Sequence, residues 1–178
     1  MTWWTMNLAA SASRIRIAPP PSIGVGAAIE MSSSSNDRAT AMAKFSLHER
    51  LRADTIELTR WPLSIVLLMN VRHWPWLVLV PRRPDIREIH ELQETDQRAL
   101  TAEIVRASRT LTDLVQPHKI NVAALGNVVP QLHVHVIARF TDDPAWPKAV
   151  WGTVPPEPYP AVELQQRVKS FQKALADG

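Results

Sequence analysis

Five short apolar segments and one long amphipathic stretch limit the folds open to this chain. The longest apolar run, LSIVLLM at residues 63–69, has the length of a strand and falls far short of the ~20 residues that a membrane-spanning helix needs. Short turns separate neighbouring segments, as at residues 70–75, which favours antiparallel hairpins over parallel strands with helical crossovers. We therefore expect an α+β fold built on an antiparallel sheet of about five strands.

One long helix and a C-terminal helix should accompany the sheet. Residues 96–115 place four leucine or isoleucine side chains on one face at helical spacing, with Thr95 as the expected cap and Pro117 as the stop. A C-terminal helix is expected at residues 161–176, and a short one at residues 45–54. The expected strands are residues 55–61, 63–70, 76–80, 118–126 and 131–140, and the loop at residues 81–92 has room for one helical turn.

Composition narrows the functions that the chain can carry. The 178 residues contain no cysteine, which excludes disulfides, thiolate zinc sites and thiol nucleophiles and suits a cytoplasmic protein. The formal net charge of +3 is too small to argue for nucleic-acid binding. Residues 1–41 are rich in small residues, Pro and Ser and lack apolar periodicity, so we expect a disordered N-terminal extension there and a compact domain at residues 42–178.

The segment VVPQLHVHVIARF, residues 128–140, carries the side chains that point most directly to a function. Alternate residues of a strand share a face, so Gln131, His133 and His135 should project together, opposite the apolar residues between them. Such a face can be a solvated polar surface or a catalytic or anion-binding strand. It can also be half of a zinc site, whose further ligands would come from His73, His90 or His118.

The same segment resembles the signature of the histidine triad family of nucleotide hydrolases and transferases, which is His-x-His-x-His with apolar residues at x. Here the signature reads QLHVHVI, residues 131–137. Residues 67–92 resemble the first hairpin of that family, and NVAALGNVV, residues 121–129, resembles its next strand and glycine turn. The resemblance covers residues 45–140 and is strongest to a bacterial branch in which QLHVH is followed by DPAWP and VWG.

That resemblance implies roles for individual residues. His133 would attack the α-phosphate of a nucleotide and form a covalent nucleotidyl-imidazole, which water then releases, while His135 would donate a hydrogen bond to a phosphate oxygen. The nucleophile must be a neutral imidazole whose far nitrogen is hydrogen-bonded, and we expect a backbone carbonyl of the neighbouring strand as the acceptor. The residues implied to contact the nucleotide are Asn70, Asn121, Gly126 and Asn127.

The implied partners follow from the same family. They are a purine nucleotide or a dinucleoside polyphosphate, together with a second copy of the chain in a homodimer formed through the long helix and an edge strand. The chemistry requires no metal and no other cofactor, and we expect no membrane or nucleic-acid partner.

Three positions depart from the family pattern. Gln131 replaces the first histidine, which helps the leaving group depart, and an amide can donate a hydrogen bond but cannot give a proton. Val128 lacks a hydroxyl group for the phosphate, and Trp76 replaces a histidine at the entry to the second strand of the hairpin. We therefore expect a leaving group that departs without protonation, such as a polyphosphate or an acyl phosphate.

Several functions remain open at this point. The first is a hydrolase or nucleotidyl transferase acting on a nucleoside phosphoanhydride, and the second is a nucleotide-binding or regulatory module with little turnover. A zinc-binding protein is a third. Arg82 and Arg83 can contact phosphate or be solvated, and the tryptophan pairs Trp74/Trp76 and Trp146/Trp151 can stack on a base or pack in the core. The histidines expected to be incidental surface residues are His48, His73, His90 and His118.

Overall fold

A computed structural model describes residues 44–177 of the chain, so the predicted N-terminal extension lies outside the described residues. Helices and strands appear close to where the sequence places them. In chain order they are α1 (Glu49–Asp54), β1 (Thr55–Arg60), β2 (Ser64–Met69), β3 (Trp76–Pro81), the 3-10 turn η1 (Ile89–Glu91), α2 (Glu94–Val115), β4 (Lys119–Ala124), β5 (Val134–Arg139) and α3 (Ala161–Asp177).

The strands form one five-stranded sheet in the order β1-β2-β3-β5-β4, and all neighbouring strands are antiparallel. The predicted α+β class, with one long helix and a C-terminal helix, is confirmed. β5 lies between β3 and β4, where His135 is paired with Val78 on one side and Ala123 on the other. The histidine-bearing strand is therefore interior to the sheet, with a hydrogen-bonded neighbour on each side.

Several predicted boundaries are wrong, and the first is that of α1, which begins at Glu49 rather than at Phe45. α2 begins at Glu94 rather than Asp96, with Gln93 as its N-cap, so Thr95 lies inside the first turn and is not the cap. Its end is as expected, because Gln116 adopts a left-handed conformation with φ of 47° and Pro117 follows. β5 begins at Val134, so its hydrogen-bonded pairing starts after Gln131 and His133.

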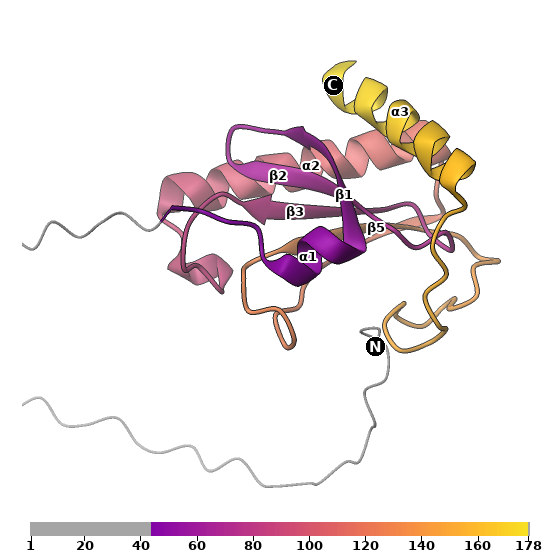
Figure 1. Ribbon diagram of the computed structural model, residues 1–178, viewed down its shortest axis with the longest axis horizontal. Coiled ribbons are helices and arrows are strands. Elements are labelled where there is room, and N and C mark those ends of the chain that lie inside the picture. The colour runs from indigo at the N-terminus through magenta and orange to yellow at the C-terminus, as the bar shows by residue number, and fades with distance from the viewer. Residues whose placement is uncertain (1–43, 178) are drawn as a thin grey trace, which may run out of the picture. The chain divides into compact units, whose positions relative to one another are not determined.

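Helices cover one face of the sheet and irregular chain covers the other. α2 and α3 lie over the first face, where Leu100, Leu111 and Phe171 pack against sheet residues such as Leu77 and Val136 (Figure 1). On the second face, residues of α1 and of the segment 141–159 pack around Trp74 and Trp76, which are 0% and 1% exposed. Full burial of large apolar side chains contributes ~1.5–3 kcal/mol each, so both faces stabilise the fold.

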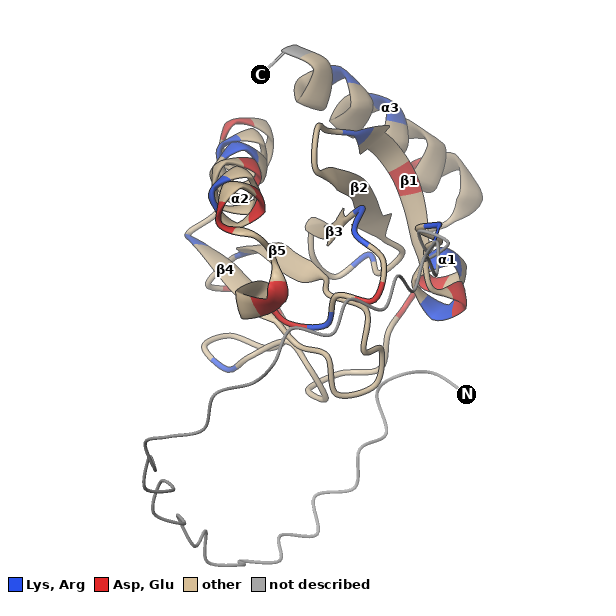
Figure 2. Ribbon diagram, turned by 90° about the vertical axis from the view of Figure 1, so that its left-hand side faces the viewer, with Lys and Arg blue, Asp and Glu red and all other residues tan. Residues whose placement is uncertain are grey.

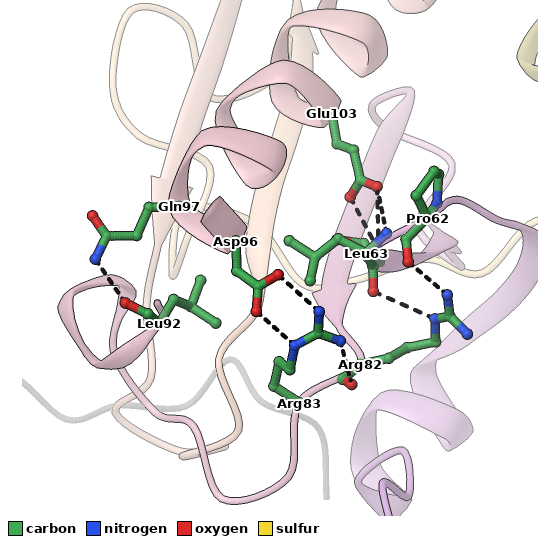
Figure 3. A network of polar contacts seen from close by, with 9 residues as sticks. Pro62, Leu63, Arg82, Arg83, Leu92, Asp96, Gln97 and Glu103 are labelled. Carbon is green, nitrogen blue, oxygen red and sulfur yellow. Dashed lines mark hydrogen bonds and ion pairs between the residues drawn. The ribbon is translucent and has the colours of Figure 1, made fainter. Parts of the chain in front are cut away.

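A buried carboxylate ties α2 to the sheet. Glu103 is 7% exposed, and its side chain accepts hydrogen bonds from the backbone N–H groups of Leu63 and Ser64 at 2.9 and 3.1 Å (Figure 3). Arg82 donates to the carbonyls of Trp61 and Pro62 in the same turn.

Arg83 forms a two-pronged ion pair with Asp96 on the first turn of α2, at 2.6 and 2.7 Å. Both arginines, left open above as phosphate ligands, therefore hold the β1–β2 turn and the helix against the end of β3.

β2 and β3 carry no charged residue. Figure 2 shows acidic and basic residues on the helices, on connecting loops and on β1. Among the described residues, no helix has the length and apolar character needed to cross a membrane.

Candidate active site

His133 and His135 project from the second face of the sheet, as the alternation predicts. Leu132, Val134 and Val136 belong to the helix-covered core on the opposite side. The two imidazole rings meet edge to face, with centroids 4.9 Å apart. His133 is 1% and His135 2% exposed, so this face is a closed, apolar environment and the solvated-surface interpretation is wrong.

The hydrogen bond of His133 determines which ring nitrogen carries its proton. Nδ1 lies 2.7 Å from the backbone carbonyl oxygen of Gln131. A carbonyl can only accept, so Nδ1 must carry the hydrogen and Nε2 of the neutral ring holds the lone pair. The acceptor belongs to the chain two residues earlier and not to a neighbouring strand, which corrects the expectation. The reason is local. Residues 131–133 precede β5, which begins at Val134, so the carbonyl of Gln131 is free of strand pairing there and accepts from the side chain of His133.

His135 has the opposite arrangement. The indole Nε1–H of Trp76 donates to its Nδ1 at 3.0 Å, and both side chains are buried. Indole has a donor and no acceptor, so Nδ1 of His135 is unprotonated and the proton of the neutral ring lies on Nε2. The sequence pattern indicated Trp76 as a departure from the family and, with Trp74, as a base-stacking or core residue. The strand pairing that puts it beside His135 was the missing signal.

Both imidazoles are held neutral near physiological pH. Burial lowers the pKa of His133, the hydrogen bond to the Gln131 carbonyl partly offsets this, and the nearby His48 lowers the pKa further. Burial lowers the pKa of His135 to about 3, and the neighbouring His133 adds to the effect. One ring therefore presents a lone pair at Nε2 and the other presents an N–H at Nε2.

The side-chain amide of Gln131 is hydrogen-bonded to the chain that enters α1. Its side-chain oxygen accepts from the backbone N–H of His48, and its side-chain nitrogen donates to the carbonyl of Ser46, each at 2.9 Å. The amide thus binds the backbone of the segment 44–48, which enters α1. The side-chain NH₂ group of Gln131 has two hydrogens. One is donated to the carbonyl of Ser46, and the other is not used in the bonds to Ser46 and His48.

The two asparagines implied to contact a nucleotide each have one amide atom engaged. The oxygen of Asn70, just after β2, accepts from the backbone N–H of Tyr159 at 3.1 Å. The oxygen of Asn121, on β4, accepts from Arg139 at 2.8 Å, and Asn121 is paired with Ile137 on the histidine face. In both residues the side-chain N–H₂ group is the end that a ligand could use.

The glycine turn between β4 and β5 is an exposed loop. Gly126 and Asn127 are both exposed, and Val129 is buried behind them against the second face. A Cβ added at Gly126 would meet nothing closer than 3.6 Å, so this position does not require glycine for space. Val128, which replaces a hydroxyl residue of the family, is 42% exposed.

Tryptophans enclose the histidines. The ring of Trp151 lies edge to face with His135 at 5.5 Å and with Trp76 at 5.7 Å. Val150 and Ala145 of the same segment are buried in this cluster. Trp76 and Trp151 are therefore packing and hydrogen-bonding partners of the site, and Trp146 packs on His118, with ring centroids 5.1 Å apart.

A buried ion pair anchors the covering segment to β5. The side chains of Arg139 and Asp143 are 1% and 2% exposed and lie 2.7 Å apart. Arg139 also donates to the carbonyl of Lys148 and to Asn121. Burial disfavours ionisation of Asp143, but hydrogen bonds from Arg139 and from the backbone N–H of Ala145 outweigh it and bring the pKa to about 2.

A metal site finds no support in this part of the chain. Within residues 44–177, no three His, Asp or Glu side chains lie together as the ligands of a metal ion would. The zinc-binding alternative therefore lacks a third ligand among the described residues.

Comparisons with known proteins identify the family of this chain. The model of the HIT domain family matches residues 51–142. The chain belongs to the HIT, or histidine triad, family. A search of curated proteins found no match.

Solved HIT structures share the fold closely. A histidine triad protein from Bradyrhizobium japonicum is 48% identical, with a TM-score of 0.72, over 74% of this chain and 98% of the other. A histidine triad protein from Marinobacter aquaeolei is 48% identical, with a TM-score of 0.73, over 75% and 98%. A HIT protein from Sinorhizobium meliloti is 45% identical, with a TM-score of 0.71, over the same shares of the two chains, 75% and 98%.

Proposed function

We propose that this HIT protein cleaves a nucleoside phosphoanhydride through a nucleotidyl-histidine intermediate on His133, acting as a hydrolase or nucleotidyl transferase. One observation carries the proposal, which is the opposite orientation of two neighbouring neutral imidazoles. Nδ1 of His133 donates to a carbonyl, and Nδ1 of His135 accepts from Trp76. A nucleophile and a hydrogen-bond donor therefore stand side by side, with ring centroids 4.9 Å apart.

The chemical steps follow from the two rings. The Nε2 lone pair of His133 attacks the α-phosphorus, a P–N bond forms, and the P–O bond to the leaving group breaks with its electron pair going to oxygen. The Nε2–H of His135 donates to a non-bridging phosphate oxygen and stabilises the charge that develops there. Water then attacks the same phosphorus, releases the mononucleotide and restores the imidazole.

The substrate class follows from the absence of a third histidine on this face. Cleavage of a phosphoanhydride releases a leaving group that is already a stable anion. A hydrogen bond to its departing oxygen therefore suffices, and the enzyme need not give it a proton. Dinucleoside polyphosphates and acyl-adenylates are substrates of this kind. We propose that the amide N–H₂ groups of Asn70 and Asn121 and the exposed turn at Gly126 and Asn127 contact the purine nucleotide.

Substrate entry requires the chain to move. His133 and His135 are closed to solvent, and the segment carrying Val150 and Trp151 packs over them. A nucleotide can reach Nε2 of His133 only when this cover shifts. Its exclusion of water strengthens the hydrogen bonds to phosphate once the nucleotide is bound.

A second candidate function is a nucleotide-binding or regulatory module with little turnover. The observation that favours it is the engagement of Gln131 with the backbone of Ser46 and His48, which spends part of its hydrogen-bonding capacity away from any substrate. Binding by His135 and the asparagines does not depend on Gln131, so this function would survive the loss of turnover.

We further propose a homodimer through α2 and β4. β4 is an edge strand of the sheet, and its Val122 is 48% exposed. Val122 is paired with Val136, which faces the helix-covered side, so it points toward the side on which α2 presents the 43% exposed Val105. A second copy would cover both valines and the open edge.

The decisive experiment compares the parent with His133→Ala. Diadenosine tetraphosphate should yield mononucleotide, and an acid quench should trap adenylyl-protein, in the parent only. We expect turnover to fall by more than about 10³-fold, as for other lost nucleophiles, while AMP still binds. His118→Ala, at an exposed histidine, is the control and should retain activity. Undiminished turnover by His133→Ala would exclude the covalent mechanism.

A further inference from the structure

A pocket lies beside the histidine face on the Gln131 side. It has a volume of about 480 Å³ and is lined by residues 44–46 and His48, by the loop 84–87 and by Pro130 and Gln131. That volume is typical of sites for small ligands. The lining stops at Gln131, two residues before His133.

The side chains of this pocket favour an anion. The lining includes the basic residues Lys44, His48 and Arg87. It includes one carboxylate, that of Asp85, and the other lining residues are apolar or uncharged. Lys44 and Arg87 are exposed, as flexible phosphate ligands at the mouth of a pocket would be. A phosphate chain carries the charge that two cations and a hydrogen-bond donor would bind.

Gln131 ties one lining segment of this pocket to the chain that leads to His133. Its amide pairs with the backbone on both sides of Leu47, accepting from the N–H of His48 and donating to the carbonyl of Ser46. In sequence, Gln131 is 83 residues from His48 and 85 residues from Ser46. The glutamine thus places His48, a residue expected to be incidental, next to the position of the missing first histidine.

The ring of His48 is held in one tautomer. Its Nδ1 accepts a hydrogen bond from the backbone N–H of Arg50 at 3.2 Å, as the N-cap of α1. An accepting Nδ1 carries no proton, so the neutral ring has its N–H at Nε2. His48 and His133 are both bonded to Gln131, the first through its backbone N–H at 2.9 Å and the second through its ring Nδ1 at 2.7 Å. His48 therefore offers a fixed donor near the nucleophile.

We propose that this pocket is the leaving-group site of the reaction and that His48 is a catalytic hydrogen-bond donor to the departing phosphate chain. The inference rests on the proposed function and deepens it. As Nε2 of His133 forms its bond to the α-phosphorus, the bridging oxygen receives the electron pair of the breaking P–O bond. Nε2–H of His48 hydrogen-bonds that oxygen and keeps its proton, while Lys44 and Arg87 bind the outer phosphates.

This arrangement specifies the substrate class. A neutral His48 whose Nδ1 is occupied gives a hydrogen bond and not a proton, so the leaving group must depart as an anion. The cations at the mouth favour a leaving group that carries several phosphates. The preferred substrates are therefore nucleoside polyphosphates, in which a phosphate chain and not a single phosphate or an amine departs.

The test compares two substrates that give the same adenylyl-His133. Diadenosine tetraphosphate releases a phosphate chain, whereas the p-nitrophenyl ester of AMP releases a phenolate without phosphate charge. The test variants are His48→Asn, which retains an N-cap acceptor for Arg50, and Arg87→Gln. The controls are the same changes at exposed positions. They are His118→Asn, directly before β4, and Arg109→Gln, on α2.

We expect His48→Asn and Arg87→Gln each to lower kcat/KM for diadenosine tetraphosphate about ten- to hundredfold, the usual effect of losing a hydrogen bond to a charged group. Arg87→Gln should change kcat/KM for the p-nitrophenyl ester less than about threefold, because that substrate has no outer phosphates, whereas His48→Asn should lower it as well, because the departing phenolate oxygen takes the same hydrogen bond. The controls should leave both substrates unchanged. Equal losses of Arg87→Gln on the two substrates would overturn the leaving-group assignment, because a damaged fold or nucleophile affects both.

A binding measurement separates this inference from the proposed function. Inorganic tripolyphosphate is titrated into the parent, His48→Asn and Arg87→Gln by calorimetry, which needs no turnover. We expect binding by the parent and a dissociation constant raised at least about tenfold in each variant. Binding that both variants leave unchanged would refute the pocket assignment, even with an active enzyme. Full turnover by His133→Ala would instead refute the proposed function alone.

Discussion

The indole N–H of Trp76 donates to Nδ1 of His135 across 3.0 Å, and neither side chain is more than 2% exposed. The pair joins two strands, since Trp76 begins β3 and His135 lies in β5 beside it. Because indole cannot accept, the bond leaves His135 one neutral tautomer, with its proton at Nε2. Trp76 is thus a positioning residue for the donor in the proposed reaction.

Trp76→Phe should release this tautomer while keeping most of the packing. We expect kcat to fall about tenfold with KM little changed, because a net hydrogen bond of ~1–1.5 kcal/mol orients the donor. Nitrogen NMR of His135 should show proton density shifting from Nε2 toward Nδ1. Trp61→Phe is the matched control, a buried indole in the helix-side core, and should leave both readings unchanged. An unaltered NMR spectrum of His135 in Trp76→Phe would contradict the assignment.

Folding stability should fall as the pH drops below 6.5. Burial lowers the pKa of His133 and His135 in the folded chain, whereas the unfolded chain takes up protons near 6.5. The unfolded state therefore binds more protons between pH 6.5 and about 3, the folded pKa of His135. The expected loss is up to about 1.4 kcal/mol per pH unit for each histidine.

Urea unfolding at a series of pH values checks this expectation. His135→Phe should flatten the dependence between pH 6 and pH 4, since it removes one of the two groups, and His118→Phe should not. Asp143 adds a separate loss at lower pH, because its pKa falls from 3.8 to about 2 on folding and its stabilisation is lost as it becomes protonated. Stability that stays constant from pH 7 to pH 4 would show that the histidines are not held neutral by the fold.

Asp143→Asn should be among the most destabilising single changes. It leaves the guanidinium of Arg139, 1% exposed, without its charge partner and loosens the cover over the histidines. Breaking a buried pair in this way costs about 3–5 kcal/mol in the free energy of unfolding. Glu94→Gln removes an ion pair whose side chains are 77% and 78% exposed and should cost less than about 1 kcal/mol. Similar costs for the two variants, measured by urea unfolding, would contradict this account.

Deleting residues 1–41 should leave the fold and nucleotide binding intact. The reason is compositional, since this segment has no periodic apolar face to add to a core. The melting temperature and the dissociation constant of AMP should match those of the full chain. Insolubility of the truncated chain, or loss of AMP binding, would show that the segment belongs to the working protein.

Local pattern by itself determined much of this protein. Period-two alternation in QLHVHVI places both histidines on one face of a strand, and short turns make the sheet antiparallel. Leucines at helical spacing predict α2. Each of these signals lies within about twenty residues of sequence, and regular backbone geometry converts such spacing into a shared face. The family resemblance rested on the same local motif.

Only the tertiary structure decided how the site residues are used. Gln131 bonds the backbone of Ser46 and His48, 85 and 83 residues away, and Trp76 bonds His135 across 59 residues. These partners meet because of strand register and the path of the chain around the sheet, which no local periodicity encodes. Burial of the histidines depends likewise on the segment around Trp151 packing over them. Long-range contacts therefore decide which nitrogen of His135 carries its proton and how deeply both rings are buried, and with these the chemistry that the face can perform.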